Sequence, residues 1–348
     1  MTVLSHNNLE DKISLVLVPL LASAGVRILK PIWSDELSGQ ALLDNLLSIP
    51  GITLPTNPED IDRLLERIGG AYASVLEFFP LYKEGLTYPD PDEINRFKVY
   101  SLFTLYAVNW DGIVVDIRIG DYSNLIKIQN AQELAMDLKE HCDAACIGSS
   151  FFISNLKQPL GHAIGPILEL QETLDVLKAK GPLDFTKLAI EQGADLLMHA
   201  GTFTDRPLAK SFLKKQLQNG AALDRFKDIV QALKGTTEVA NDLYPFPLAK
   251  RNLRIVSHKE GYIQRIAMGR LFDLKHRLCS EHKGAGLLLL KKIGDTTDKN
   301  DTLAEAYLPP SWDTQLIQTE VQNIFSISHF PPEFQPLIAE KIKGSFRF

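Results

Sequence analysis

The stretch from residue 158 to residue 180 combines residue types that could bind a ligand. Two glycines and two prolines surround His162, and Gln158 opens the run. Glycines directly before a helix let a ligand, or another backbone segment, approach the main chain closely. Glu169 follows in the first turn of the predicted helix, where the helix dipole favours a carboxylate. The pattern also fits a tightly packed junction of loop and helix without a ligand, and both interpretations stay open.

The helix that would hold this loop is amphipathic. Its apolar residues recur near the i, i+3, i+4, i+7 spacing of one buried face. They are Ile167, Leu168, Leu170, Leu174 and Leu177.

Two runs of the chain carry a family resemblance. Residues 158–177, QPLGHAIGPILELQETLDVL, resemble the QPLG…IGxxLExxExLxxL segment of the thymidine/pyrimidine-nucleoside phosphorylase family. GHAIGP, followed by GPLDF at 181–185, is most similar to the AMP phosphorylase branch. Residues 283–307, KGAGLLLLKKIGDTTDKNDTLAEAY, resemble the C-terminal signature of the family. Because both runs occur in the same order, the chain is identified as a divergent member of this family.

The resemblance implies a pentosyltransferase that cleaves the N-glycosidic bond of a nucleoside or nucleotide with phosphate. Phosphate would be the co-substrate, and no cofactor is expected. Such a phosphate needs a glycine-rich turn, backbone N–H donors and a cation. The departing base needs a cationic or proton-donating contact.

The phosphate-binding motifs of the family are degraded in this chain. Residues 3–12, VLSHNNLEDK, match its Lys-His-Ser-x-Gly-Gly run but lack the lysine and the histidine before the serine, and the paired glycines after it. Residues 33–42, WSDELSGQAL, match its second phosphate run but lack the arginine and the threonine, and two acids there would repel phosphate. We therefore expect phosphorolysis to be weak or lost. The remaining phosphate-binding candidates are Ser5, His6, Lys12, Ser34 and Ser38.

The base-binding helix of the family, which carries Arg, Ser and Lys, matches a shortened region here. Arg96 and Tyr100 are the candidates for contact with base or sugar, together with Gln158 and His162. In some relatives the carboxylate matching Glu169 helps to bind a monovalent cation, so Glu169 is the metal candidate. Each residue also has an ordinary alternative, as a solvated side chain or a local hydrogen-bonding group.

Alternating strand and helix patterns predict the elements around these residues. β-prone runs at 26–32, 112–119 and 144–153 alternate with helical runs, which indicates an α/β domain with a mainly parallel sheet over residues 1–235. A linker at 236–251 and a smaller α+β C-terminal domain at 252–348 should follow. Ligands of parallel sheets bind at the carboxyl ends of the strands.

Composition excludes several classes of protein. The chain has 348 residues, 45% of them hydrophobic, and a net charge of −6, which argues against binding to nucleic acid. It has no apolar run of the ~20 residues that span a membrane, and no signal-peptide pattern. Of three cysteines, Cys142 and Cys146 are expected to be core thiols. We expect a soluble, cytoplasmic protein.

Two classes of function remain open. One is a divergent nucleoside phosphorylase; the other is a non-catalytic binding or regulatory protein, or a subunit that pairs with a full-length relative. The chain starts at the phosphate loop, so most of the α domain of the family, which carries the dimer contact, is expected to be missing. Self-association, or contact with a partner protein, is then expected through a face formed by residues 1–25 and 90–110.

Overall fold

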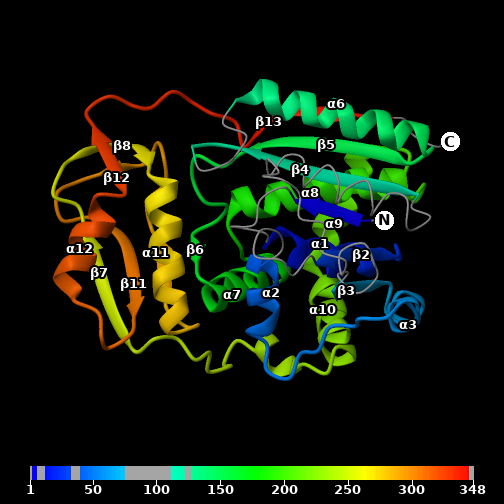
Figure 1. Ribbon diagram of the computed structural model, residues 1–348, viewed down its shortest axis with the longest axis horizontal. Coiled ribbons are helices and arrows are strands. Elements are labelled where there is room, and N and C mark those ends of the chain that lie inside the picture. Colours follow the sequence, from blue (N-terminus) through cyan, green and yellow to red (C-terminus); the bar gives the residue numbers. More distant parts are fainter. Residues whose placement is uncertain (1, 6–11, 33–39, 75–110, 122–126, 345–348) are drawn as a thin grey trace, which may run out of the picture.

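A mainly parallel six-stranded sheet lies at the centre of the larger unit of the protein (Figure 1). The computed structural model describes residues 2–5, 12–32, 40–74, 111–121 and 127–344. The strand order of the sheet is β13-β5-β4-β1-β2-β3, and every neighbouring pair is parallel except β13–β5. The bounds are β1 Thr2–Ser5, β2 Ile28–Ile32, β3 Gly70–Ser74, β4 Gly112–Ile119, β5 Gly148–Asn155 and β13 Ile338–Lys343. The predicted α/β class is confirmed.

The order of the strands creates a switch point between β1 and β4. From β1 the chain adds β2 and β3 on one side, and β4 and β5 then lie on the other side. In open α/β sheets, ligands bind outside the carboxyl ends of the strands at such a point. Ser5, at the end of β1, is paired in register with Asp116 of β4.

Helices cover both faces of this sheet. One face packs on α1 and α8, with α7, α9 and α10 in the same hydrophobic core, and the other face packs on α3 and α6. Their bounds are α1 Ile13–Ser23, α3 Pro58–Ile68, α6 Ile128–Ala144, α7 Pro166–Leu177, α8 Leu183–His199, α9 Arg206–Gln218 and α10 Ala221–Ala232; α2, Gln40–Leu47, contacts α7.

Helix α3 shows how local sequence sets the bounds of an element. The Asn57 side chain accepts a hydrogen bond from the backbone N–H of Asp60 at 2.8 Å, and Pro58 occupies the first turn. Gly69 ends the helix with φ +85°, a left-handed conformation that glycine adopts without strain. Asn57 and Gly69 therefore set the two ends of this helix.

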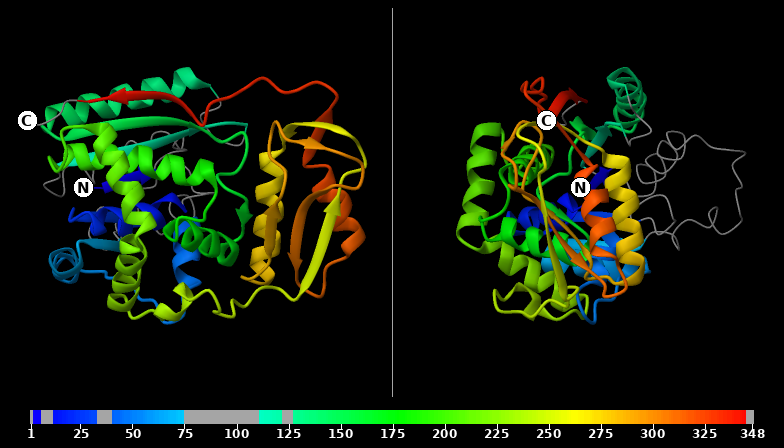
Figure 2. Two further views of the ribbon diagram at one scale, coloured as in Figure 1. Left: turned by 180° about the vertical axis from the view of Figure 1, so that it is seen from behind. Right: turned by 90° about the vertical axis from the view of Figure 1, so that its left-hand side faces the viewer.

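The C-terminal unit contains two smaller sheets, ordered β10-β8-β12 and β6-β9-β11-β7, with two helices. Its elements are β7 Arg251–Val256, β8 Gly261–Ile266, α11 Met268–Glu281, β9 Gly286–Leu289, β10 Thr296–Thr297, β11 Thr302–Leu308, α12 Thr314–Gln322 and β12 Phe325–Ser328. The chain crosses between the two units more than once. Strand β6, Ala163–Ile164, leaves the loop after β5 and pairs with β9, and the red segment of Figure 2 crosses back to place β13 beside β5. The division at residues 236–251 stays a prediction.

Two expectations need correction. Residues 13–22 were expected to contribute to an exposed apolar face, but all of them are buried among α7, α8 and α10. Cys142 is buried as expected, whereas Cys146 is exposed and has φ +55°. Within the described part of the chain, no helix is long and apolar enough to cross a membrane.

The burial of the cysteines makes a prediction about their reactivity. Burial raises the pKa of Cys142 and of Cys279 to about 12, so both remain thiols near neutral pH, and thiols are poor nucleophiles. We expect a thiol reagent to modify the native protein once, at Cys146. Intact-mass spectrometry should show one adduct on the native protein, none on Cys146→Ser, and three on the denatured chain, which has three cysteines. Modification of native Cys146→Ser at a comparable rate would contradict this assignment.

Candidate functional site

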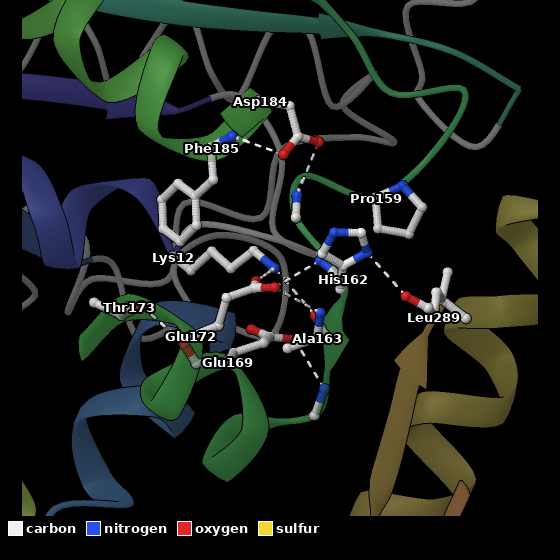
Figure 3. Close-up of polar contacts among 12 residues, drawn as sticks. Lys12, Pro159, His162, Ala163, Glu169, Glu172, Thr173, Asp184, Phe185 and Leu289 are labelled. Atoms are coloured by element: carbon white, nitrogen blue, oxygen red, sulfur yellow. Dashed lines mark hydrogen bonds and ion pairs between the residues drawn. The ribbon is translucent and has the colours of Figure 1, made fainter. Parts of the chain in front are cut away.

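The Gly-rich loop before α7 is organised by one buried carboxylate (Figure 3). Glu172 Oε1 accepts hydrogen bonds from the backbone N–H groups of His162, at 2.6 Å, and Ala163, at 3.1 Å. Its Oε2 accepts one from Lys12 Nζ at 2.6 Å. The conformation of the loop therefore depends on the Glu172 carboxylate, which α7 holds beside the loop.

Lys12 supplies the compensating positive charge. Its side chain is 0% exposed, and Nζ also donates to the carbonyl oxygen of Ala163 at 3.0 Å. The ammonium lies 5.5 Å from the centroid of the Phe185 ring, within the range of a cation–π contact. Lys12 was predicted to bind phosphate; in this structure its side chain is directed to the loop and to the core.

The negative charge of Glu169, one turn earlier on α7, is balanced by a lysine of the C-terminal unit, Lys275. Its Oε1 accepts hydrogen bonds from Gly165 N–H at 3.0 Å and from Lys275 Nζ at 2.7 Å, and its Oε2 accepts one from Asn45 Nδ2 at 3.0 Å. Burial alone would raise the pKa of Glu169, but the charges of Lys275 and Lys12 outweigh it and hold the pKa below its ordinary value. The carboxylate is therefore ionised inside the protein.

The surroundings of Glu169 bear on its predicted role as a metal ligand. Three donors already contact the carboxylate, and one of them is an ammonium group. Across the described residues, no cluster of three or more His, Cys, Asp or Glu side chains could hold a metal ion. Cation binding at Glu169 stays a prediction.

The first residues of the loop attach it to the C-terminal unit. Gln158 Oε1 accepts a hydrogen bond from Ile293 N–H at 2.8 Å, and His162 Nδ1 lies 2.9 Å from the carbonyl oxygen of Leu289. Lys292 Nζ donates to the carbonyl oxygens of Pro159 and Gly161. Both predicted base or sugar contacts in this loop, Gln158 and His162, therefore take part in joining the two units.

The loop glycines are required by close packing. Gly161 has φ +64°, and a Cβ atom there would lie 2.4 Å from Glu172 Oε2. Gly165 has φ +122°, and its Cβ would lie 2.7 Å from the carbonyl oxygen of Ala285. These contacts support the interpretation of a packed junction between loop and helix, which the sequence left open.

A hollow of about 730 Å³ lies at the carboxyl ends of β4 and β5, beside the C-terminal unit. Gln158 lines it together with Asp121, Asn155 and residues 331–335 and 337. Across it, Arg265 of β8 forms an ion pair with Asp121 at 2.7 Å. This edge of the sheet therefore faces the C-terminal unit.

Most other predicted site residues fall outside the described part of the chain. These are His6, Ser34, Ser38, Arg96 and Tyr100. Ser5 ends β1 beside Asp116, in the position expected of a residue near the switch point. Its contact with phosphate stays a prediction.

A charged cluster inside the central strand β4 was not among the predicted site residues. Arg118 Nε donates to Asp116 Oδ2 at 3.0 Å, and Ser154 Oγ of β5 donates to Asp116 Oδ1 at 2.5 Å. All three residues are buried. The signal was present in the sequence, because GIVVDIRI places two charges two residues apart in an otherwise apolar strand.

Curated relatives named pyrimidine-nucleoside phosphorylase are similar to this chain over most of its length. That from Geobacillus stearothermophilus is 29% identical, over 97% of this chain and 81% of the relative. That from Staphylococcus epidermidis is 25% identical, over 86% and 72% respectively. No protein-family model matches the chain. Anthranilate phosphoribosyltransferase from Thermus thermophilus has a TM-score of 0.47 and 12% identity, over 67% of this chain and 78% of that structure, a likeness too weak to add to the sequence similarity.

The Lys12–Glu172 pair predicts a large loss of stability when one partner is removed. In Lys12→Met, the buried Glu172 side chain loses its ammonium partner, and breaking a buried ion pair in this way typically costs about 3–5 kcal/mol. Urea unfolding should show this loss in the free energy of unfolding. Lys187→Met, at an exposed lysine of α8, is the matched control and should change it by about 0.5 kcal/mol or less. The double variant Lys12→Met/Glu172→Gln should recover part of the loss, and equal stability of Lys12→Met and wild type would refute the role of the pair.

Proposed function

Because the chain belongs to the thymidine/pyrimidine-nucleoside phosphorylase family, we propose that it is a divergent pentosyltransferase that acts on nucleosides or nucleotides with phosphate, and that its phosphorolysis is weak. The observation that carries the proposal is the similarity to pyrimidine-nucleoside phosphorylases over 97% of the chain. The likeness to the AMP phosphorylase branch stays a prediction, because the relatives compared carry the pyrimidine-nucleoside name.

The proposed reaction exchanges one bond at the sugar for another. A phosphate oxygen forms a bond to C1′ of the ribose while the bond from C1′ to the base nitrogen breaks, and the bonding electrons leave with the base. A proton then reaches the base, which gives free base and a sugar 1-phosphate. The switch point between β1 and β4 is the place in this fold where such substrates would bind.

Weak turnover follows from the chemistry of the residues present. Valine and leucine occupy residues 3 and 4, where the family has a lysine and a histidine, and neither side chain can donate a hydrogen bond to an anion. Loss of one oriented donor typically costs a factor of about 10²–10³ in rate.

The second candidate is a non-catalytic binding or regulatory protein. The observation that favours it is that Lys12, Gln158 and His162 are all bound to other parts of the chain. In this proposal the α/β scaffold is kept while the phosphate site no longer supports turnover.

An activity assay separates the two candidates. Purified protein should be incubated with phosphate and thymidine, uridine or AMP, and released base should be measured by chromatography. We expect a rate at least about 10²-fold below that of the Geobacillus stearothermophilus relative assayed alongside. A reaction without phosphate controls for hydrolysis by contaminants. A rate equal to that of the relative would refute the predicted weakening, and no phosphate-dependent release at all would favour the non-catalytic candidate.

Self-association, or pairing with a partner protein, is also proposed. Because residues 13–22 are buried, the proposed contact now rests on residues 90–110, which lie outside the described part of the chain. Size-exclusion chromatography with light scattering should give a mass above that of the 38.9 kDa chain, and Phe103→Glu should lower it. A wild-type mass equal to one chain at high concentration, with no bound protein, would refute the proposal.

A further inference from the structure

The charged cluster of β4 is costly for a purely structural feature. Asp116 and Arg118 are both buried in the middle of a parallel sheet, and their neighbours along the strand are apolar. Removing two charges from water costs several kcal/mol per ion, so an apolar pair of similar volume is often equally stable or more so. Stability alone therefore does not account for these residues.

The cluster of Asp116, Arg118 and Ser154 lies beside the switch point, where ligand-binding residues of such sheets are found. Asp116 of β4 is in register with Ser5, the last residue of β1. Arg118 is two residues further along β4 and lies on the same face, beside the switch point. Helix α1, which follows β1 in the chain, packs on this face and begins at Ile13. Ligands of such sheets bind outside the carboxyl ends of the strands beside the switch point.

The contacts of the cluster hold Arg118 in one orientation. Asp116 accepts Arg118 Nε with one carboxylate oxygen and Ser154 Oγ with the other, so the carboxylate is fixed from two strands. Arginine carries its N–H donors in a rigid planar fork that matches the oxygens of phosphate. Because Asp116 balances the charge of Arg118, attraction to an anion would come from directed hydrogen bonds more than from net charge.

We propose that Arg118 is a phosphate ligand of this chain and that Asp116 and Ser154 position its guanidinium group. This proposal rests on the proposed function, since the anion is the co-substrate phosphate. It supplies the cation that the sequence lacks at residues 3 and 4, which are valine and leucine.

Binding of inorganic phosphate, measured by isothermal titration calorimetry, tests the proposal without any need for turnover. Wild type should bind phosphate, and Arg118→Met should bind it at least about tenfold more weakly, because a hydrogen bond to a charged group is lost. Arg118→Lys keeps the charge without the fork and should be intermediate. Ser154→Ala should weaken binding less than Arg118→Met, because it removes only one support of Asp116.

Arg206→Met is the matched control. Arg206 is a half-buried arginine that, like Arg118, bonds carboxylates, in this case those of Asp195 and Glu191. Its loss should lower stability without changing the phosphate dissociation constant. If Arg118→Met does not fold, as judged by circular dichroism, Arg118→Lys decides the question.

The results separate this proposal from the proposed function. Loss of phosphate binding in Arg118→Met supports the assignment even if wild type releases no base. Unchanged phosphate affinity in folded Arg118→Met and Arg118→Lys overturns it even if wild type is active. Absence of phosphate binding by wild type at millimolar concentration also overturns it.

Discussion

The pairing of two buried carboxylates on α7 with lysines from elsewhere in the chain is the constraint on which the described loop depends. Glu172 is matched by Lys12, next to α1, and Glu169 by Lys275 of α11 in the C-terminal unit. An unpaired buried carboxylate would be strongly destabilising, so neither lysine can be lost without consequence. Helix α7 therefore ties the first helix of the large sheet to the second unit, and strand β6 continues that connection as main-chain pairing with β9.

This geometry explains why Gly161 and Gly165 occur in the Gly-rich loop before α7, since both are required by close packing. The loop must pass close to Glu172 on one side and to the strand entering the C-terminal sheet on the other, where a Cβ atom at Gly161 or Gly165 would not fit. A match to this motif alone therefore indicates a shared junction between units. It does not require that the loop itself contact substrate. Residues that bind or convert a substrate are expected at the carboxyl ends of the parallel strands.

Local patterns predicted the α/β class and strand β4 well, because both depend on neighbouring residues. Pairings that join distant parts of the chain were not predictable: Lys12 and Glu172 are 160 positions apart, and β6 has only two residues. Strand β13 was missed because its partner, β5, lies in the other half of the chain. The two charges of Asp116 and Arg118 were visible in the sequence. Their place beside the switch point could not be predicted, because it depends on the pairing of β4 with β1.

The distribution of charge bears on whether this chain still handles an anion. Lys12, the lysine nearest to the first helix, is committed to the core, whereas Arg118 lies beside the point where the strand order reverses. A chain that had only to maintain its scaffold would be served equally well by an apolar residue at position 118, since buried ion pairs contribute little net stability. The supported guanidinium group at this position is therefore the reason for proposing that the phosphate site of this chain has diverged and has not been lost completely.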